Sequence, residues 1–394
     1  MTRPRLVGLV GSVWRGAGLL LLALLLLDGL LRLTLSDPDD LAEFGGAGGV
    51  YAQARSPDRY KADAYAGVDW SDDYWREFHD SKEMRWEPYV YFRRRPYAGR
   101  YIRVDERGLR STWNPPGPAA GPRVWMLGGS ALWGTGARDD DTIPSLVSRR
   151  LAESGRPCQV VNLGESGWVA TQELVMLARE VQAGRVPDVV VFFDGVNEVA
   201  AARQGSTAGI PQNEWNRVAE FNLSDDRVRL ARRLGQKLFT GLVRLSAILD
   251  ARSASQAALD RDAIDRRAAD AVRSYAQALR LAVDLGQARG FDVLAYCQPV
   301  ISDRRAPSDY ERRVWEAASA QDREWQAAFE AAVAASPDLA ALPFESVAHL
   351  LDETPGPVFI DYCHVSEAGN AVVADAIVAD LLPLLERRTA VTER

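Results

Sequence analysis

Cysteine and histidine are scarce in this chain, which holds three of each among 394 residues. Three cysteines, Cys158, Cys297 and Cys363, are too few for a disulfide framework, and an odd number leaves at least one thiol free or paired with another molecule. The sequence has no Cys-x-x-Cys pair and no cysteine–histidine cluster at the spacing of metal ligands. We therefore predict no structural zinc site.

The chain also lacks a net positive charge. Its formal net charge is −7 and its isoelectric point is near 5.3, and its basic residues are mostly arginines spread along the sequence. Contacts with a phosphate backbone need a basic surface, so we do not expect a nucleic-acid partner. Hydrophobic residues make up 47% of the chain and charged residues 26%, which is typical of a globular protein rather than a disordered one.

A leucine-rich run lies near the amino terminus, where residues 18–35 read GLLLLALLLLDGLLRLTL. Together with the mostly apolar segment 6–14, this run is long enough for a helix that spans a bilayer. Asp28 inside the run is costly in lipid, but Arg32 lies one helical turn later and can pair with it. Three arginines precede the run and three aspartates follow it, namely Arg3, Arg5, Arg15, Asp37, Asp39 and Asp40.

By the positive-inside rule, this distribution of charge leaves the amino terminus in the cytoplasm and the rest of the chain outside it. We predict a cytoplasmic tip and an uncleaved, single-pass membrane anchor over residues 1–36. A cleaved signal peptide is one alternative, which the lack of an Ala-x-Ala site directly after the leucines disfavours. A buried helix of a soluble protein is another, which the leucine and alanine content of residues 19–30 disfavours.

Residues 37–118 are predicted to form a linker followed by a small aromatic-rich extension. The linker, to about residue 58, is rich in Asp, Gly, Ala and Pro. Tryptophan, tyrosine and acidic residues crowd residues 70–86, which favours a short helix, and the runs at 89–92 and 101–104 favour two strands. An aromatic-rich surface binds sugar rings or packs against a neighbouring domain, and the sequence leaves both interpretations open.

From residue 119 to residue 390 the pattern alternates between strand and helix. Short apolar runs typical of buried strands occupy residues 124–127, 159–163, 189–193 and 291–296. Amphipathic helical patterns follow strands at residues 142–153 and 171–181, and a final helix is expected at 367–382. This alternation predicts an α/β fold with three α/β/α layers around a parallel, doubly wound sheet.

Two helical insertions, at residues 214–290 and 303–340, are expected within that domain. They either cap the carboxyl edge of the sheet and shape a pocket or pack as ordinary helices, and both interpretations stay open. Parallel strands deliver the loops that follow them to one edge of the sheet, so residues far apart in the sequence can meet there.

A serine follows the first predicted strand of this domain on a glycine corner. Gly128 and Gly129 end the strand, and Ser130 comes next. The carboxyl end of a strand is where an open α/β sheet places ligand chemistry, so Ser130 is the candidate nucleophile. Gly-Gly-Ser is also a common turn and helix N-cap, and the remaining motifs decide between the two interpretations.

A serine hydroxyl needs a base to take its proton, and the chain offers His79, His349 and His364. His364 follows Asp361 by three residues, which is close enough for the carboxylate to bond the imidazole and set its tautomer. The Asp-x-x-His spacing after the last loop therefore predicts His364 as the base and Asp361 as its orienting partner.

Attack on an ester also creates an oxyanion, which needs preorganised hydrogen-bond donors. The loops that follow three successive predicted strands carry Ser130, Gly167 and Asn197. We predict that the backbone amides of Ser130 and Gly167 and the side-chain amide of Asn197 form the oxyanion hole.

Four motifs in this order resemble those of SGNH/GDSL-type hydrolases, over residues 123–385. They read GGSALWG around Ser130, NLGESG around Gly167, DGVNE around Asn197, and DYCH from Asp361 to His364. The resemblance implies an SGNH-hydrolase fold of the flavodoxin-like type and assigns these five residues the roles predicted above. It also implies that the reaction requires no metal and no organic cofactor.

The chain departs from the family pattern at several positions. Gly129 stands where the family's name motif has an aspartate, and Glu198 stands where the third motif has an aspartate. The helical insertions are longer than in a minimal member. Cys363 lies beside the expected base, where a thiol either tunes the site or simply packs in the core.

We predict a membrane-anchored, extracytoplasmic serine esterase of bacterial type that cleaves O-acyl esters, such as O-acetyl esters, of a glycan or lipid through an acyl-enzyme. An O-acyltransferase that passes the same acyl group to a glycan acceptor is the nearest alternative. A catalytically silent, anchored glycan-binding or assembly protein is an alternative of a different class. An intracellular metabolic hydrolase would require the leucine run to be buried.

Overall fold

The computed structural model describes residues 3–34, 62–116, 121–204, 207–221, 239–242, 245 and 260–392. The chain forms two compact units, one from residues 1–47 and 213–258 and the other from residues 48–212 and 259–394. All five candidate site residues belong to the larger unit.

A five-stranded parallel sheet forms the centre of the larger unit. Its strands are β5 (Arg123–Gly128), β6 (Gln159–Asn162), β7 (Val189–Asp194), β8 (Asp292–Cys297) and β9 (Phe344–Ser346), in the spatial order β6-β5-β7-β8-β9. Val124 on β5 pairs with Val160 on β6 and with Val189 on β7. This strand order is that of a doubly wound sheet, so the predicted parallel α/β architecture is confirmed.

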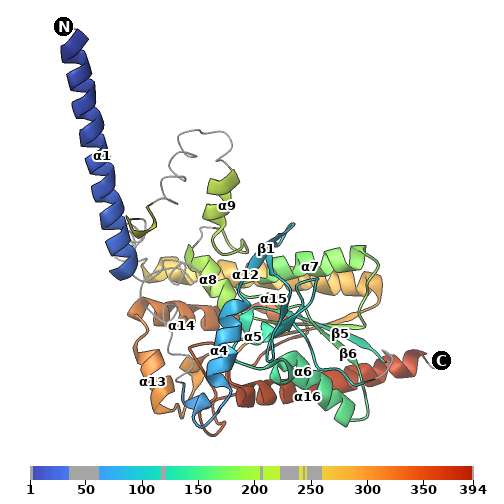
Figure 1. Cartoon of the computed structure of the whole chain (residues 1–394). Coiled ribbons are helices and arrows are strands. Elements are labelled where there is room, and N and C mark those ends of the chain that lie inside the picture. The colour runs from blue at the N-terminus through green and yellow to red at the C-terminus, as the bar shows by residue number, and fades with distance from the viewer. Residues whose placement is uncertain are drawn as a thin grey trace. The chain divides into compact units, whose positions relative to one another are not determined.

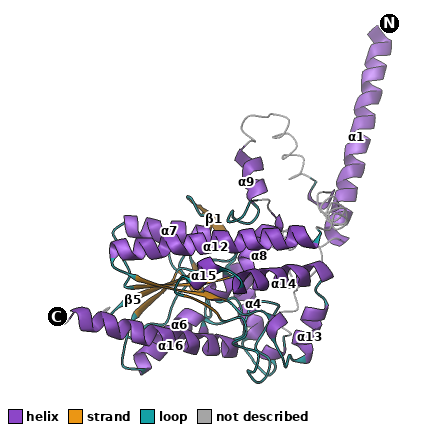
Figure 2. Ribbon diagram, turned by 180° about the vertical axis from the view of Figure 1, so that it is seen from behind, coloured by secondary structure: helices purple, strands orange, loops and turns teal. Residues whose placement is uncertain are grey.

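Helices cover both faces of the sheet, as Figures 1 and 2 show. On one face lie α6 (Ile143–Glu153) and α16 (Glu367–Thr392), which pack against each other; on the other lie α7 (Ala170–Gln182) and α12 (Arg261–Arg289), which also pack together. Because both faces are covered, β7 is buried along its whole length, and this explains its unbroken apolar run VVVFF.

Local sequence signals set the ends of the layer helices. Thr142 caps α6 by accepting a hydrogen bond from the backbone N–H of Ser145, and Asp260 caps α12 by accepting one from Ala263. Gly290 ends α12 in the left-handed conformation, with a φ of 84°. The core between the sheet and the pair α6 and α16 contains Val124, Met126, Leu146, Val191 and Ile377, among others.

The composition of the last helix, α16, suits either a membrane span or a buried core helix. The stretch Glu367–Arg388 is long and apolar enough to cross a membrane, and 44% of it is buried. Its side chains Val373, Ile377 and Leu381 are fully buried in the core beside the sheet. We therefore interpret α16 as a core helix of the α/β/α sandwich.

The first predicted insertion, residues 214–290, divides between the two units. It contains α9 (Glu214–Phe221), which belongs to the smaller unit, and α12, which forms part of a layer. The second, residues 303–340, contains α13 (Asp309–Glu316), α14 (Ala320–Ala334) and α15 (Pro337–Ala340), and α14 packs on α12. The structure adds β9, a strand of three residues that the sequence pattern did not indicate.

The described part of the aromatic-rich extension is tied to the catalytic domain. It contains α4 (Ser71–Asp80), β1 (Met84–Glu87), β2 (Tyr91–Arg94), β3 (Tyr97–Ala98), β4 (Arg103–Val104) and the short 3₁₀ helix Asp63–Tyr65. The strand predicted at 89–92 begins later, because residues 88–90 form the turn of the β1–β2 hairpin. Tyr74 and Phe78 on α4 share a buried aromatic cluster with Trp133 of the α/β domain.

The smaller unit contains α1 (Arg3–Thr34), which covers nearly all of the predicted anchor. The predicted pair between Asp28 and Arg32 is present, with Arg32 Nε 2.6 Å from Asp28 Oδ2. Asp28 Oδ1 accepts a further hydrogen bond from the backbone N–H of Leu242, at 3.0 Å. The predicted linker, from residue 37 to about residue 58, lies outside the described residues.

Candidate active site

The candidate nucleophile stands where the first strand of the sheet turns into a helix. β5 ends at Gly128, Gly129 forms the N-cap, and Ser130 is the first residue of α5 (Ser130–Trp133). The hydroxyl oxygen of Ser130 lies 2.7 Å from Nε2 of His364, which is 234 residues away in the sequence. Ser130 is 8% exposed and His364 is 2% exposed, so their hydrogen bond is shielded from bulk water.

The loop before α16 holds the histidine in a fixed orientation. Asp361 Oδ2 lies 2.7 Å from Nδ1 of His364. The other carboxylate oxygen, Oδ1, accepts hydrogen bonds from the backbone N–H groups of Cys363 (2.9 Å) and His364 (2.7 Å). With Nδ1 donating to Asp361, the tautomer leaves Nε2 free to accept from Ser130, which is the arrangement a general base needs.

The two other candidate oxyanion donors lie on neighbouring loops. Gly167 follows β6 and has a φ of 79°, a conformation that favours glycine. Asn197 is at the start of α8 (Val196–Gln204), directly after β7, and its Nδ2 donates to the carbonyl oxygen of Trp168 at 2.7 Å. The backbone N–H groups of Ser130 and Gly167 donate to no acceptor among the described residues. Both N–H groups are therefore free to bind another oxygen.

The departure of Gly129 from the family motif has a physical reason in this chain. A Cβ atom at position 129 would overlap Nδ2 of Asn197. Any larger residue there would push the amide group of Asn197 away from the corner that carries Ser130. Glycine at this position therefore lets the loops after β5 and β7 touch.

Two buried charged residues hold the loop that carries Gly167. Glu165 is fully buried, and its carboxylate accepts from the backbone N–H of Ser166 (2.8 Å) and from the backbone N–H of Arg94 (3.0 Å). The guanidinium of Arg94 donates to Ser166 Oγ at 3.1 Å and lies 3.7 Å from the ring centre of Trp133. A side chain of the extension thus connects α5, which begins with Ser130, with the loop that carries Gly167.

Cys363 is close to the base but buried. Its Sγ is 3.6 Å from Nδ1 of His364, and together with Asp361 the two residues form the one described group of three side chains close enough to share a metal ion. The carboxylate of Asp361 already accepts three hydrogen bonds within this loop. A metal bound there would have to replace the contact between Asp361 and His364, so we assign the three side chains to the hydrogen-bonded loop.

Three carboxyl groups are buried beside one another at the carboxyl end of β7. Glu198 accepts hydrogen bonds from the backbone N–H groups of Ala170 (2.8 Å) and Gly195 (3.2 Å). No other described group donates to the carboxyl oxygens of Glu173 or Asp194. Burial, with repulsion from Glu198, raises the pKa of Glu173 to about 8, and burial beside Glu173 and Glu198 raises the pKa of Asp194 well above its usual value. We infer that Glu173 and Asp194 hold at least one proton between them at neutral pH.

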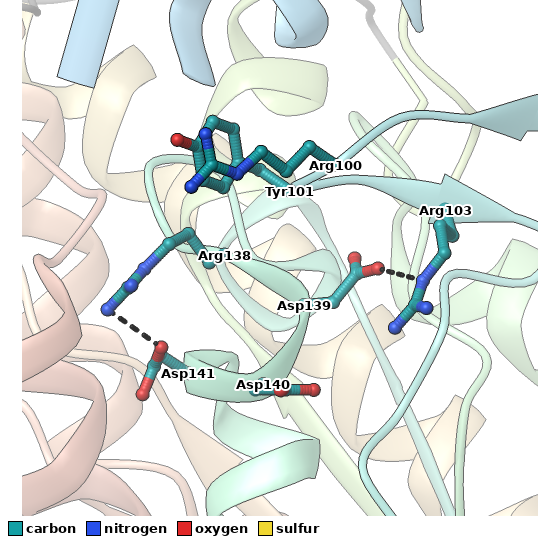
Figure 3. Close-up of a pocket in the computed structure, with 7 residues that line it drawn as sticks. All are labelled: Arg100, Tyr101, Arg103, Arg138, Asp139, Asp140 and Asp141. Atoms are coloured by element: carbon teal, nitrogen blue, oxygen red, sulfur yellow. Dashed lines mark hydrogen bonds and ion pairs between the residues drawn. The ribbon is translucent and has the colours of Figure 1, made fainter. Parts of the chain in front are cut away.

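A polar pocket of about 260 Å³, drawn in Figure 3, is lined by none of the candidate site residues. Its lining consists of three arginines, three aspartates and a tyrosine: Arg100, Arg103, Arg138, Asp139, Asp140, Asp141 and Tyr101. Arg103 pairs with Asp139 at 3.2 Å and Arg138 pairs with Asp141 at 3.1 Å. The formal charges cancel, and we assign no ligand to this pocket.

The structure thus brings Ser130, His364 and Asp361 into one hydrogen-bonded line. It places the other two histidines elsewhere: His79 is exposed on α4, and His349 is exposed and pairs with Asp352. Sequence reasoning missed Arg94, Glu165 and Gln212, whose roles depend on contacts over long sequence separations. The NLGESG motif includes Glu165, but nothing in the sequence indicates its buried partner.

Comparisons with known proteins found similarity among solved structures alone. No family model and no curated protein matches the chain. Among solved structures, a lipase/acylhydrolase from Enterococcus faecalis is 16% identical, with a TM-score of 0.34 and coverage of 66% of this chain and 95% of that one.

Two further structures give similar values. Est24, a carbohydrate acetylesterase from Sinorhizobium meliloti, is 11% identical, with a TM-score of 0.36 and coverage of 67% of this chain and 99% of that one. A lipolytic protein of the G-D-S-L family from Desulfitobacterium hafniense is 11% identical, with a TM-score of 0.34 and coverage of 66% of this chain and 98% of that one. Because these TM-scores are low, the function proposed below rests on the geometry of the site.

The buried carboxyl cluster predicts how stability depends on pH. Because the folded pKa of Glu173 is raised from 4.5 to about 8, the unfolded chain ionises first, and the folded state loses stability as the pH rises through this window. Glu173→Gln removes one titrating group and keeps a donor for Asp194. The decline in unfolding free energy between about pH 5 and about pH 8 should become shallower by up to about 1.4 kcal/mol per pH unit.

Urea unfolding across this pH range measures the effect. Glu324→Gln on the exposed surface of α14 is the matched control and should leave the slope unchanged. Equal slopes for wild type and Glu173→Gln would mean that Glu173 is ionised in the folded protein.

Proposed function

We propose that this protein is a serine esterase that works through an acyl-enzyme. The observation that carries the proposal is the buried line from Ser130 Oγ to His364 Nε2, and from His364 Nδ1 to Asp361, with 2.7 Å at each step. A nucleophile, a base and an orienting carboxylate at hydrogen-bond distance form the minimal machinery for attack on an ester.

The geometry supports a defined sequence of proton transfers. Ser130 Oγ attacks the acyl carbon while His364 Nε2 takes the hydroxyl proton, and Asp361 stabilises the resulting imidazolium. His364 then gives this proton to the departing alcohol oxygen as the acyl-enzyme forms. A water molecule, deprotonated by His364, attacks the acyl-enzyme and releases the acid and free Ser130.

The oxyanion formed in each half of the reaction needs donors. The backbone N–H groups of Ser130 and Gly167 and Nδ2 of Asn197 are the groups we propose for this role. Removal of one such donor typically slows an enzyme by about 100-fold to 1000-fold. An acyltransferase would use the same machinery with a sugar hydroxyl in place of water.

We further propose a glycan as the alcohol part of the ester. Trp86 on β1 is 63% exposed, and Tyr89 in the hairpin turn is 78% exposed. The ring of Trp86 lies 5.7 Å from that of Tyr91, so the hairpin presents a group of aromatic rings of the kind that packs on sugar rings.

The hairpin is held firmly in place. Tyr89 and Tyr91 have φ values of 68° and 73°, which are strained for residues with a side chain. Val90 between them is fully buried, and its carbonyl oxygen accepts from Gln172 Nε2 at 2.8 Å. Gln172 is in the first turn of α7, five residues after Gly167. Its hydrogen bond therefore holds the hairpin near the candidate site.

A groove beside the hairpin favours a polar polymer over a lipid surface. It has a volume of about 500 Å³ and is lined by arginines and glutamates, including Arg85, Glu87, Arg107, Arg179 and Glu180. Arg179 bonds Glu87 at 2.8 Å and lies 5.9 Å from the ring centre of Tyr89. Mixed charges of this kind offer both hydrogen-bond donors and acceptors to sugar hydroxyls.

We propose, finally, that α1 anchors the protein in a membrane with the catalytic domain outside the cytoplasm. Leucines on all sides of the helix are exposed, and Leu19, Leu26 and Leu33 are each more than 60% exposed. A helix that is apolar all round and is not buried in protein is stable in lipid. The bond between Asp28 and Arg32 reduces the cost of the charged residue in that helix.

Loss of the nucleophile tests the proposed chemistry. The full-length protein in detergent should hydrolyse p-nitrophenyl acetate, and Ser130→Ala should lower kcat by more than about 1000-fold because no acyl-enzyme forms. Ser154→Ala, at the exposed end of α6, is the matched control and should keep full activity. Activity retained in Ser130→Ala would contradict the assignment, and a folded wild type inactive on all esters would favour a transferase or a silent binding protein.

The glycan proposal predicts a loss that depends on the substrate. Trp86→Ala and Tyr89→Ala should each lower kcat/KM on acetylated xylan by about 5-fold, since an aromatic contact contributes about 1 kcal/mol. Neither should change hydrolysis of p-nitrophenyl acetate, and Phe221→Ala on the exposed surface of α9 should change neither activity. An equal loss on both substrates would mean that the aromatic residues only support the fold.

The anchor proposal predicts that charge within α1 releases the protein from membranes. Leu21→Lys combined with Leu25→Lys should move the protein from the membrane fraction to the soluble fraction, because each lysine is costly in the bilayer centre. Leu281→Lys, at an exposed leucine of α12, is the matched control and should leave the protein with the membrane. An intact mass that lacks residues 1–36 would instead indicate a cleaved signal peptide.

A further inference from the structure

Gln212 contacts both Gly167 and Asn197, the two residues that carry proposed oxyanion donors besides Ser130. It lies in the short loop between α8 and α9, and its side chain is turned inward, with 7% of the residue exposed. Its Nε2 lies 3.2 Å from Oδ1 of Asn197 and 3.3 Å from the carbonyl oxygen of Gly167. One side-chain amide therefore contacts the two residues proposed to bind the oxyanion together with Ser130.

The surrounding carbonyl groups determine which way both amides face. The carbonyl oxygen of Trp168 only accepts, so the end of Asn197 that is 2.7 Å away must be its NH₂ group. Oδ1 of Asn197 then faces Gln212, which must present its own NH₂ group to that oxygen and to the carbonyl of Gly167. This chain of donors and acceptors is consistent in one orientation only.

That orientation keeps the donor end of Asn197 at the nucleophile corner. Nδ2 of Asn197 is the atom that a Cβ at position 129 would overlap, so it lies directly against the residue before Ser130. In the described part of the chain, Gln212 is the one recorded donor to Oδ1 of Asn197. Without Gln212, this buried oxygen loses its hydrogen bond and the amide loses a constraint on its rotation.

Stability alone does not account for a glutamine at this position. Oε1 of Gln212 is buried and has no hydrogen-bond partner among the described residues. A buried acceptor without a donor costs stability, so it offsets part of what the two hydrogen bonds of Nε2 contribute. Residues that are unfavourable for folding are often those that the site requires.

We propose that Gln212 is a positioning residue of the oxyanion hole, which acts by holding the amide of Asn197 and the peptide of Gly167. The inference rests on the esterase function proposed above. Gln212 does not itself bind the reacting ester, so its loss should lower kcat and leave KM nearly unchanged, because the donors are needed most in the transition state.

A double-mutant cycle with Asn197 tests this role in the full-length protein. Gln212→Met keeps the length of the side chain and removes its donor, and should lower kcat for p-nitrophenyl acetate by about 10-fold with KM within about twofold. In the Asn197→Ala background the same substitution should lower kcat by less than about threefold, because its main target is gone. Gln326→Met, at a buried glutamine of α14 that bonds Glu330 at 2.7 Å, is the matched control and should leave kcat unchanged.

The outcomes separate this inference from the esterase function. Wild-type kcat in Gln212→Met, or an equal loss with and without Asn197, would overturn the positioning role while the esterase stands. A folded wild type that hydrolyses no ester would overturn the proposed function and this inference with it. If Gln212→Met fails to fold, Gln212→Glu provides the second variant, since its carboxylate has the same length, cannot donate when ionised, and should lower kcat by at least as much.

Discussion

The close approach of three loops at the carboxyl edge of the sheet is the constraint on which the candidate site depends. A Cβ at Gly128 would lie 2.5 Å from the carbonyl oxygen of Phe193, and one at Gly164 would lie 2.9 Å from the backbone nitrogen of Trp133. Because these positions carry no side chain, the loops after β5, β6 and β7 pack backbone against backbone. The distances between Ser130, Gly167 and Asn197 follow from this packing and not from the loop residues alone.

Buried arginines attach the extension to the α/β domain. Arg93, Arg94 and Arg110 are each at most 2% exposed, and their guanidinium groups bond carbonyl oxygens of the catalytic domain or lie against Trp133 and Trp168. A buried charge that loses its partners is strongly destabilising. Separating the extension from the α/β domain would therefore cost much of the stability of the fold. We therefore regard the described part of the extension as a support of the oxyanion loop rather than a separate module.

The sequence was enough to predict the elements whose signals are local. Strands β5 and β7 are unbroken apolar runs that end at glycine or aspartate, and the Asp-x-x-His spacing places Asp361 within reach of His364 in any tight loop. The contacts of Arg94 with Ser166 and of Gln212 with Asn197 depend on tertiary packing, which no short pattern encodes. The same holds for β9, which is too short to show a period, and for the tyrosines of the hairpin, whose positive φ values run against their intrinsic preference.

The buried carboxyl groups connect the stability of the fold with the chemistry proposed for its edge. Asn197 lies between Asp194 and Glu198 in the sequence, and Glu198 bonds Ala170, three residues after Gly167. A unit negative charge roughly 10 Å from an oxyanion opposes it by about 1 to 2 kcal/mol at an effective dielectric constant of about 20. Burial that keeps at least one proton on the pair Glu173 and Asp194 lowers this opposition, while Glu198, with two N–H donors, is the member best able to carry a charge. The burial that weakens the fold toward alkaline pH therefore limits the negative charge beside the proposed oxyanion site.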